Sequence, residues 1–166
     1  MIRAGDSIGS LGADDVRRIE QLLSRLVSDT QTRCALLVDR AGRLLSRVGQ
    51  VEGLDETAFA SLASAGFAAS DQLAALLGEN EFSSLYHHGA QRSMFLADVD
   101  GTAILAVLFD TRTTLGMVRI KTKSLLPLFT ESLRRITRGG PSTSVIQTDS
   151  AWAAEAETAI DRLFRE

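Results

Sequence analysis

The chain has 166 residues, of which 45% are hydrophobic, so it is long enough to bury the core of one domain. Its formal charge of −3 and its isoelectric point near 5.4 offer no basic surface, and we expect neither nucleic acid nor a membrane as a partner. The first residues lack the apolar segment of a signal peptide, and the longest apolar run, AILAVLF at 103–109, is too short to span a bilayer. A cytoplasmic protein is expected.

The first predicted element is an amphipathic helix over residues 13–29, with apolar residues at helical spacing and two acidic residues in its first turn. Two short apolar segments follow, at 33–39 and 43–49, and the turn residues between them predict an antiparallel hairpin. The first segment holds the single cysteine, Cys34, which excludes a disulfide within the chain. Its apolar neighbours favour a buried structural cysteine over a reactive thiol.

A second helix is predicted from about Asp55 to Gly78, where glycine readily takes the left-handed conformation that closes a helix. Three strand-like segments come next, at 82–88, 92–98 and 102–110. The first, fourth and fifth strands are continuously apolar rather than alternating. This pattern indicates that both faces of the sheet are covered. We therefore expect an α/β fold of the α+β type with helices on both sides of the sheet.

A third helix is expected to begin with Thr113 or Thr114 as its N-cap and to continue toward FTESLRRITR. Pro127 lies inside it, and because proline removes a backbone donor we expect a kink or a break near Leu126.

We expect the chain to divide into a flexible N-terminus at 1–13, a folded domain at 14–138, a linker at 139–150 and a C-terminal amphipathic helix at 151–166. The apolar face of this last helix consists of Trp152, Ala156, Ile160, Leu163 and Phe164. Docking of this helix on a partner and docking on its own domain are equal alternatives.

The second helix is unusual because its middle consists almost wholly of Ala, Ser and Gly. A helical wheel predicts that one side faces the sheet, namely Phe59, Leu62, Gly66, Ala69, Leu73, Leu76 and Leu77. It places on the far side Ser64, Phe67, Ala68, Asp71 and Ala75, with Ala65 and Gln72 at one boundary. Small residues and an outward Phe67 suggest a docking surface, although ordinary surface residues explain the pattern equally well. The following strand is a plausible sheet edge that a second chain would protect.

Catalytic motifs are not found in the sequence. His87 and His88 are strand neighbours that point to opposite faces, so they are poorly placed to hold one metal ion. There is no phosphate-binding G-x-x-x-x-G-K-[ST] loop and no G-x-S-x-G nucleophile motif. Turn formation accounts for four aspartates at strand ends, Asp39, Asp98, Asp100 and Asp110. We expect no active site, cofactor or metal.

Several motifs resemble the Roadblock family, of the dynein light chain type, and within it the MglB-like regulators of small Ras-like GTPases. The most specific are GENEF at 78–82, HHGA at 87–90 and FDTRTTLG at 109–116. The resemblance extends over about residues 14–138 and implies a five-stranded antiparallel sheet with one helix on one face and two on the other. It also implies a role in bacterial polarity or motility.

The resemblance implies a homodimer that joins through the third strand, with candidate interface residues Phe82, Ser84, Leu85 and Tyr86. The two second helices would together hold one MglA-like GTPase. The candidate contacts are Ser61, Ala65, Phe67, Ala68, Ala69 and Gln72. The resemblance points to the three alanines, although the helical wheel places Ala69 nearer the core. Candidate tail contacts are Trp152, Ile160, Leu163 and Phe164.

The favoured mechanism is activation of GTP hydrolysis by tight binding of a GTPase whose own arginine is then positioned. An arginine supplied by this chain is the alternative, with Arg92 and Arg112 as the non-helical candidates. A dimeric scaffold without effect on GTP turnover is the second hypothesis. A small-molecule sensor is the third, but the apolar strands and the helical cover leave little room for its pocket.

Overall fold

The computed structural model describes residues 11–138. The order of elements within this range is the predicted one, helix, two strands, helix, three strands, helix. The elements are α1 (Ala13–Thr30), β1 (Cys34–Asp39), β2 (Leu44–Gly49), α2 (Glu56–Leu76), β3 (Ser84–His88), β4 (Ser93–Val99), β5 (Ala103–Phe109) and α3 (Leu115–Arg138). Residues 1–10, the linker and the C-terminal helix lie outside the described residues, and those expectations stay predictions.

The strands of residues 11–138 form one antiparallel sheet in the order β2-β1-β5-β4-β3. The β1–β2 turn contains Gly42 at a φ of 85°, and the β4–β5 turn contains Asp100 and Gly101, both at positive φ. These two successive left-handed residues form a tight turn, closed by the Thr102 amide donating to the Val99 carbonyl at 3.1 Å, which explains the sequence VDG here. The central strands β1 and β5 are almost wholly buried, whereas β2 and β3 are the edges.

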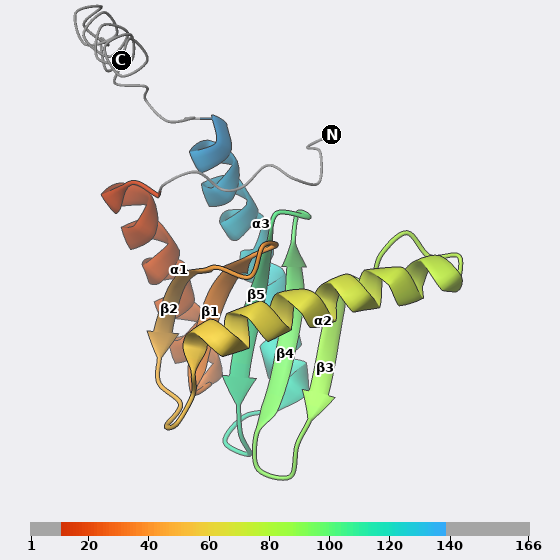
Figure 1. Cartoon of the computed structure of the whole chain (residues 1–166). Helices are drawn as coiled ribbons and strands as arrows, with labels where there is room; N and C mark the ends of the chain where they lie inside the picture. The colour runs from red at the N-terminus through yellow and green to blue at the C-terminus, as the bar shows by residue number, and fades with distance from the viewer. Residues whose placement is uncertain (1–10, 139–166) are drawn as a thin grey trace, which may run out of the picture.

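Helices α1 and α3 cover one face of the sheet, and α2 crosses the other (Figure 1). Successive residues of a central strand alternate between these two cores. Leu37 and its cross-strand partner Leu105 pack with α1 and α3, whereas Leu36 and Ile104 pack on the α2 side. This alternation explains the continuously apolar strands and confirms the two-sided cover expected from them.

Helix α3 is continuous through Pro127, so a break near Leu126 does not occur. Buried side chains on both sides of the proline, Leu125 and Phe129, anchor the helix to the sheet. Their packing offsets the cost of a proline in a helix, about 3 kcal/mol. Of the two residues predicted as the N-cap, Thr114 has this role, because its Oγ1 accepts a hydrogen bond from the Met117 amide at 3.3 Å. No helix within residues 11–138 is long and apolar enough to cross a bilayer.

Helix α2 has its predicted limits, but the side it turns to the sheet differs from the helical-wheel prediction. The Asp55 carboxylate accepts from the Ala58 amide at 3.0 Å, and Gly78 closes the helix at a φ of 76°. Phe67, expected on the outside, is 0% exposed, whereas Leu62 is 72% exposed and Leu76 82%. The wheel prediction of the inner and outer faces is therefore wrong.

The reason lies in the small residues of α2. Its buried residues recur at spacings of three and four and are Ala60, Ala63, Ser64, Phe67, Ser70 and Ala74. These small side chains, together with Phe67, form the side of the helix that packs on the sheet. The larger leucines are left on the opposite side, and hydrophobicity alone gave the wrong direction.

Candidate functional site

The candidate site is the side of α2 that faces away from the sheet, which we call the outer face. It consists of the exposed residues Leu62, Ala65, Ala69, Gln72, Leu73 and Leu76. The two alanines lie at its centre, opposite Phe67, and exposed leucines lie toward both ends of the face. A second backbone can approach closely over alanine, and the flanking leucines supply apolar area for a contact.

The outer face carries no charge. Between Thr57 and Leu76 the sequence contains a single charged residue, Asp71, which lies beside the sheet and pairs with Arg40. Uncharged, exposed apolar residues on a helix are typical of a protein contact rather than of a solvated surface. Such a face has no nucleophile, acid or base, so it can bind a partner but cannot carry out a reaction by itself.

The candidate contact residues do not all share this surface. Ser61, Ala65, Ala68, Ala69 and Gln72 are exposed on α2. Phe67 is buried beneath them and is removed from the candidate contact surface. Ala69 is exposed, as the resemblance implied and against the helical wheel. The exposed Leu62, Leu73 and Leu76 were missed as candidates, although the three-and-four spacing of small residues around Phe67 could have identified the buried side.

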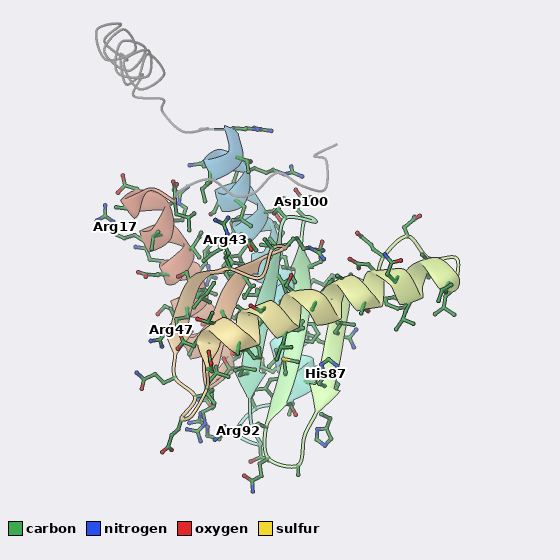
Figure 2. All side chains as sticks on the ribbon, viewed as in Figure 1. Arg17, Arg43, Arg47, His87, Arg92 and Asp100 are labelled. Atoms are coloured by element: carbon green, nitrogen blue, oxygen red, sulfur yellow. The ribbon has the colours of Figure 1, made fainter. Side chains whose placement is uncertain are left out.

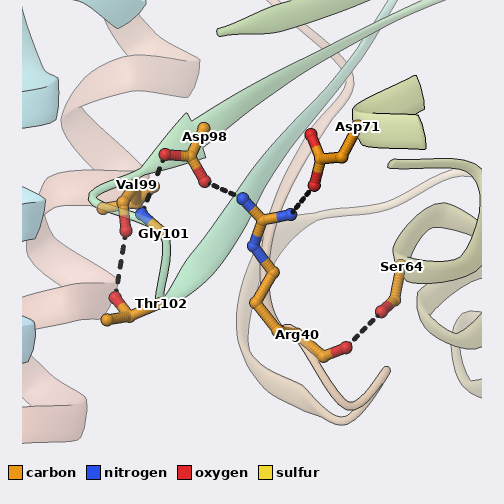
Figure 3. Close-up of polar contacts among 7 residues, drawn as sticks. All are labelled: Arg40, Ser64, Asp71, Asp98, Val99, Gly101 and Thr102. Atoms are coloured by element: carbon orange, nitrogen blue, oxygen red, sulfur yellow. Dashed lines mark hydrogen bonds and ion pairs between the residues drawn. The ribbon is translucent and has the colours of Figure 1, made fainter. Parts of the chain in front are cut away.

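A polar cluster holds α2 against the sheet (Figure 3). The Arg40 guanidinium, from the β1–β2 turn, donates from Nη1 to Asp71 Oδ2 at 3.2 Å and from Nη2 to the carboxylate of Asp98. Its carbon Cζ lies 4.8 Å from the centre of the Phe67 ring. Ser64 Oγ donates to the Arg40 carbonyl oxygen at 2.6 Å. One arginine therefore contacts three residues of α2 and one of β4.

The open edge of β3 lies next to the site. Because the Asp98 amide donates to the Ser83 carbonyl at 2.9 Å, alternation along the antiparallel pair leaves the peptide groups of Ser84, Tyr86 and His88 on the open side. The candidate interface residues Phe82, Ser84 and Leu85 are half-buried and Tyr86 is exposed. The C-terminal part of α2 extends beyond this edge (Figure 1), and it carries exposed leucines, namely Leu73, Leu76 and Leu77.

A surface hollow of about 350 Å³ lies between the β3–β4 turn and the start of α2. Its apolar lining includes Phe59 and Met94, and its basic lining includes His87 and Arg92. The last two lie near the β3–β4 turn (Figure 2). The fold thus leaves more room on this face than the sequence led us to expect. The described residues contain no group of three or more His, Cys, Asp or Glu side chains able to hold a metal ion.

The two candidate arginines differ in their surroundings. Arg92 is exposed beside the β3–β4 turn, whereas the Arg112 side chain and amide both donate to Asp110, at 3.2 and 3.0 Å. The Arg112 amide, and then the Arg33 guanidinium at 2.6 Å, lower the pKa of Asp110 to about 2. Arg112 therefore orders the turn before α3. Burial raises the pKa of the Cys34 thiol, in agreement with a structural cysteine.

Several solved structures share the architecture of this chain. MglB of Myxococcus xanthus is 35% identical, with a TM-score of 0.71 over 76% of this chain and 96% of that one. A structure described as MglB with tetrameric arrangement is 26% identical, with a TM-score of 0.72 over 76% and 95% of the two chains. The gliding protein MglB of Thermus thermophilus is 28% identical, with a TM-score of 0.67 over 79% and 96%. No curated protein sequence matches the chain.

The Roadblock/LC7 domain matches residues 18–109, more than half of the chain. These residues contain the whole sheet and α2, the helix that carries the outer face. The protein therefore belongs to the Roadblock/LC7 family.

Proposed function

We propose that this protein is an MglB-like regulator that binds a small Ras-like GTPase and stimulates its GTP hydrolysis, in bacterial polarity or motility. The observation that carries the proposal is the outer face of α2, which is uncharged, small at its centre and flanked by exposed leucines. The likeness to MglB structures supports the same interpretation.

The activation works through binding rather than through a donated catalytic group. A regulator that binds the hydrolysis-competent conformation more tightly than the resting one shifts the GTPase toward it, about tenfold for each ~1.4 kcal/mol of difference. Arg112 is engaged with Asp110, which makes it a poor donor to a partner. The GTPase then supplies the arginine that stabilises the transition state.

The proposed active form is a homodimer joined through the open edge of β3. Pairing of two such edges would satisfy the peptide groups that face outward from Ser84, Tyr86 and His88. The end of α2 that extends past this edge would then lie above the second copy (Figure 1).

The decisive experiment measures GTP hydrolysis by an MglA-type GTPase with and without the protein. We expect stimulation by the wild type and its loss in Ala65→Arg, because a long charged side chain at the centre of the outer face prevents close approach. Ser124→Arg is the matched control, since Ser124 is a small exposed residue of α3 on the other face of the sheet. Firm binding with unchanged hydrolysis would instead identify a scaffold.

The dimer is tested separately by size-exclusion chromatography with light scattering. Leu76→Glu should yield a monomer, because it charges the overhanging end of α2. Leu128→Glu changes an exposed leucine of α3 and should leave the mass unchanged. A monomeric wild type would contradict the proposed assembly.

A further inference from the structure

The packing of α2 on the sheet leaves its rotation weakly specified. Phe67 is the one large buried side chain of this helix, and the other buried positions are Ala or Ser. By contrast, α1 inserts Ile19, Leu23 and Leu26 into its core. Large side chains interdigitate and fix how a helix sits, whereas a stripe of small residues presents only shallow ridges. Another interaction must hold α2 in one orientation.

Arg40 contacts α2 along a single line of residues. Ser64, Phe67 and Asp71 are spaced three and four apart, so they lie above one another on one side of the helix. The Arg40 carbonyl accepts from the first, its guanidinium stacks on the second, and Nη1 donates to the third. Rotation of α2 about its axis would disrupt all of these contacts together.

The other end of the cluster is fixed to the sheet. Asp98 lies on β4, and its side chain is only 11% exposed. One of its carboxylate oxygens accepts from Arg40 and the other accepts from the Gly101 amide at 2.8 Å, in the β4–β5 turn (Figure 3). The guanidinium therefore connects α2 to a carboxylate that is itself hydrogen-bonded to the backbone of the β4–β5 hairpin.

The charges in the cluster make Arg40 hard to replace. Asp71 and Asp98 share this one guanidinium, and Arg40 itself is only 28% exposed. Among the described residues, Arg40 Nε and Asp71 Oδ1 are buried atoms without a hydrogen-bond partner. Neither atom therefore offers its side chain a further hydrogen bond. Without the arginine, two carboxylates would face each other across the gap between α2 and β4, and their repulsion would push the helix away.

We propose that Arg40 is a positioning residue that sets the rotation of α2 and so presents Ala65 and Ala69 outward. The inference rests on the proposed function, because it concerns how the same face is offered to the GTPase. Leu62 and Leu73 lie beside these alanines, so a modest rotation would bring a leucine to the centre of the face and block close approach. Arg40 thus supports binding from beneath the helix, without contact with the partner.

The first test needs no GTPase and measures amide hydrogen exchange of the full chain. Arg40→Met keeps the apolar stem and removes the charge, whereas Arg40→Lys keeps the charge. We expect amides of residues 64–75 to exchange at least tenfold faster in Arg40→Met and less so in Arg40→Lys, with α1 and α3 unchanged. Lys121→Met is the control, because it removes an ion pair, with Asp29, that joins α3 to α1 on the other face of the sheet.

Equal acceleration in all helices, or equal effects of methionine and lysine, would overturn the proposal. Should Arg40→Met fold poorly, Asp71→Asn removes the negative charge from one contact of the cluster and keeps its shape. It should also accelerate amide exchange in α2 alone, and the absence of such an effect would contradict the proposed role of the Arg40 cluster.

The second test measures stimulation of GTP hydrolysis by an MglA-type GTPase across a range of protein concentrations. We expect Arg40→Met to raise the concentration for half-maximal stimulation about tenfold and to leave the plateau unchanged. If amide exchange in α2 is faster but the concentration for half-maximal stimulation is unchanged, the Arg40 cluster does not affect docking of the GTPase. A wild type that does not stimulate would contradict the proposed function, while the exchange result would still decide whether Arg40 positions the helix.

Discussion

The two faces of the sheet are covered in different ways. On one face, α1 and α3 insert large side chains such as Leu23, Phe129 and Leu133 into a continuous core. On the other face, α2 contributes small residues around Phe67 and is held by the polar cluster of Arg40. The difference shows two ways of fixing a helix on a sheet: interlocking large side chains on one face, and one phenylalanine with an ion-paired arginine on the other.

The largest expected effect lies on the α1–α3 face. Phe129 is 0% exposed in the middle of that core, so Phe129→Ala should lower the free energy of unfolding by about 3–5 kcal/mol. Urea denaturation of the wild type and the variant measures this difference. A loss below ~1 kcal/mol would mean that stability does not depend on this face, and the comparison would fail.

The next effect tests the orientation of α2. Phe67 is buried and packs with Leu36 and Leu96, so Phe67→Ala should cost about 3 kcal/mol in the same measurement. Leu62→Ala is the control on the same helix, and because Leu62 is 72% exposed its effect should stay within about 0.5 kcal/mol. Equal effects of the two substitutions would mean that Phe67 is exposed, as the helical wheel predicted.

Phe67 also shows which features of the fold could be predicted from the sequence and which could not. Periodicity, turn residues and caps predicted the eight elements of residues 11–138, because each depends on local chemistry such as the Asp55 cap or Gly78. The side of α2 that meets the sheet was predicted wrongly, since apolar residues occur all around the helix and only the spacing of small residues around Phe67 marks the buried side. The Arg40 cluster could not be predicted from the sequence either, because Arg40 contacts residues 31 and 58 positions away.

A matched pair of alanines sharpens the contrast between the two sides of α2. Ala63 is buried against the sheet and Ala65 lies on the outer face. Ala63→Leu forces extra volume into the close contact and should cost about 1–3 kcal/mol of stability, whereas Ala65→Leu should change it by less than about 0.5 kcal/mol. Thermal or urea unfolding checks both. The reverse order of effects would mean that the small residues face away from the sheet.

The smallest expected effect concerns the exposed turn that leads into α3. The pKa of Asp110 falls from its ordinary value of 3.8 to about 2, because the Arg112 amide and the Arg33 guanidinium stabilise the ionised carboxylate. A carboxylate with a lowered folded-state pKa contributes stability above pH ~4, and this contribution is lost as the pH falls toward ~2. The stability difference between the wild type and Asp110→Asn should therefore shrink over this range in urea titrations at a series of pH values. A difference that stays constant down to pH ~2 would show that these bonds do not favour the ionised form, and that the turn into α3 is held by packing, like the rest of its face.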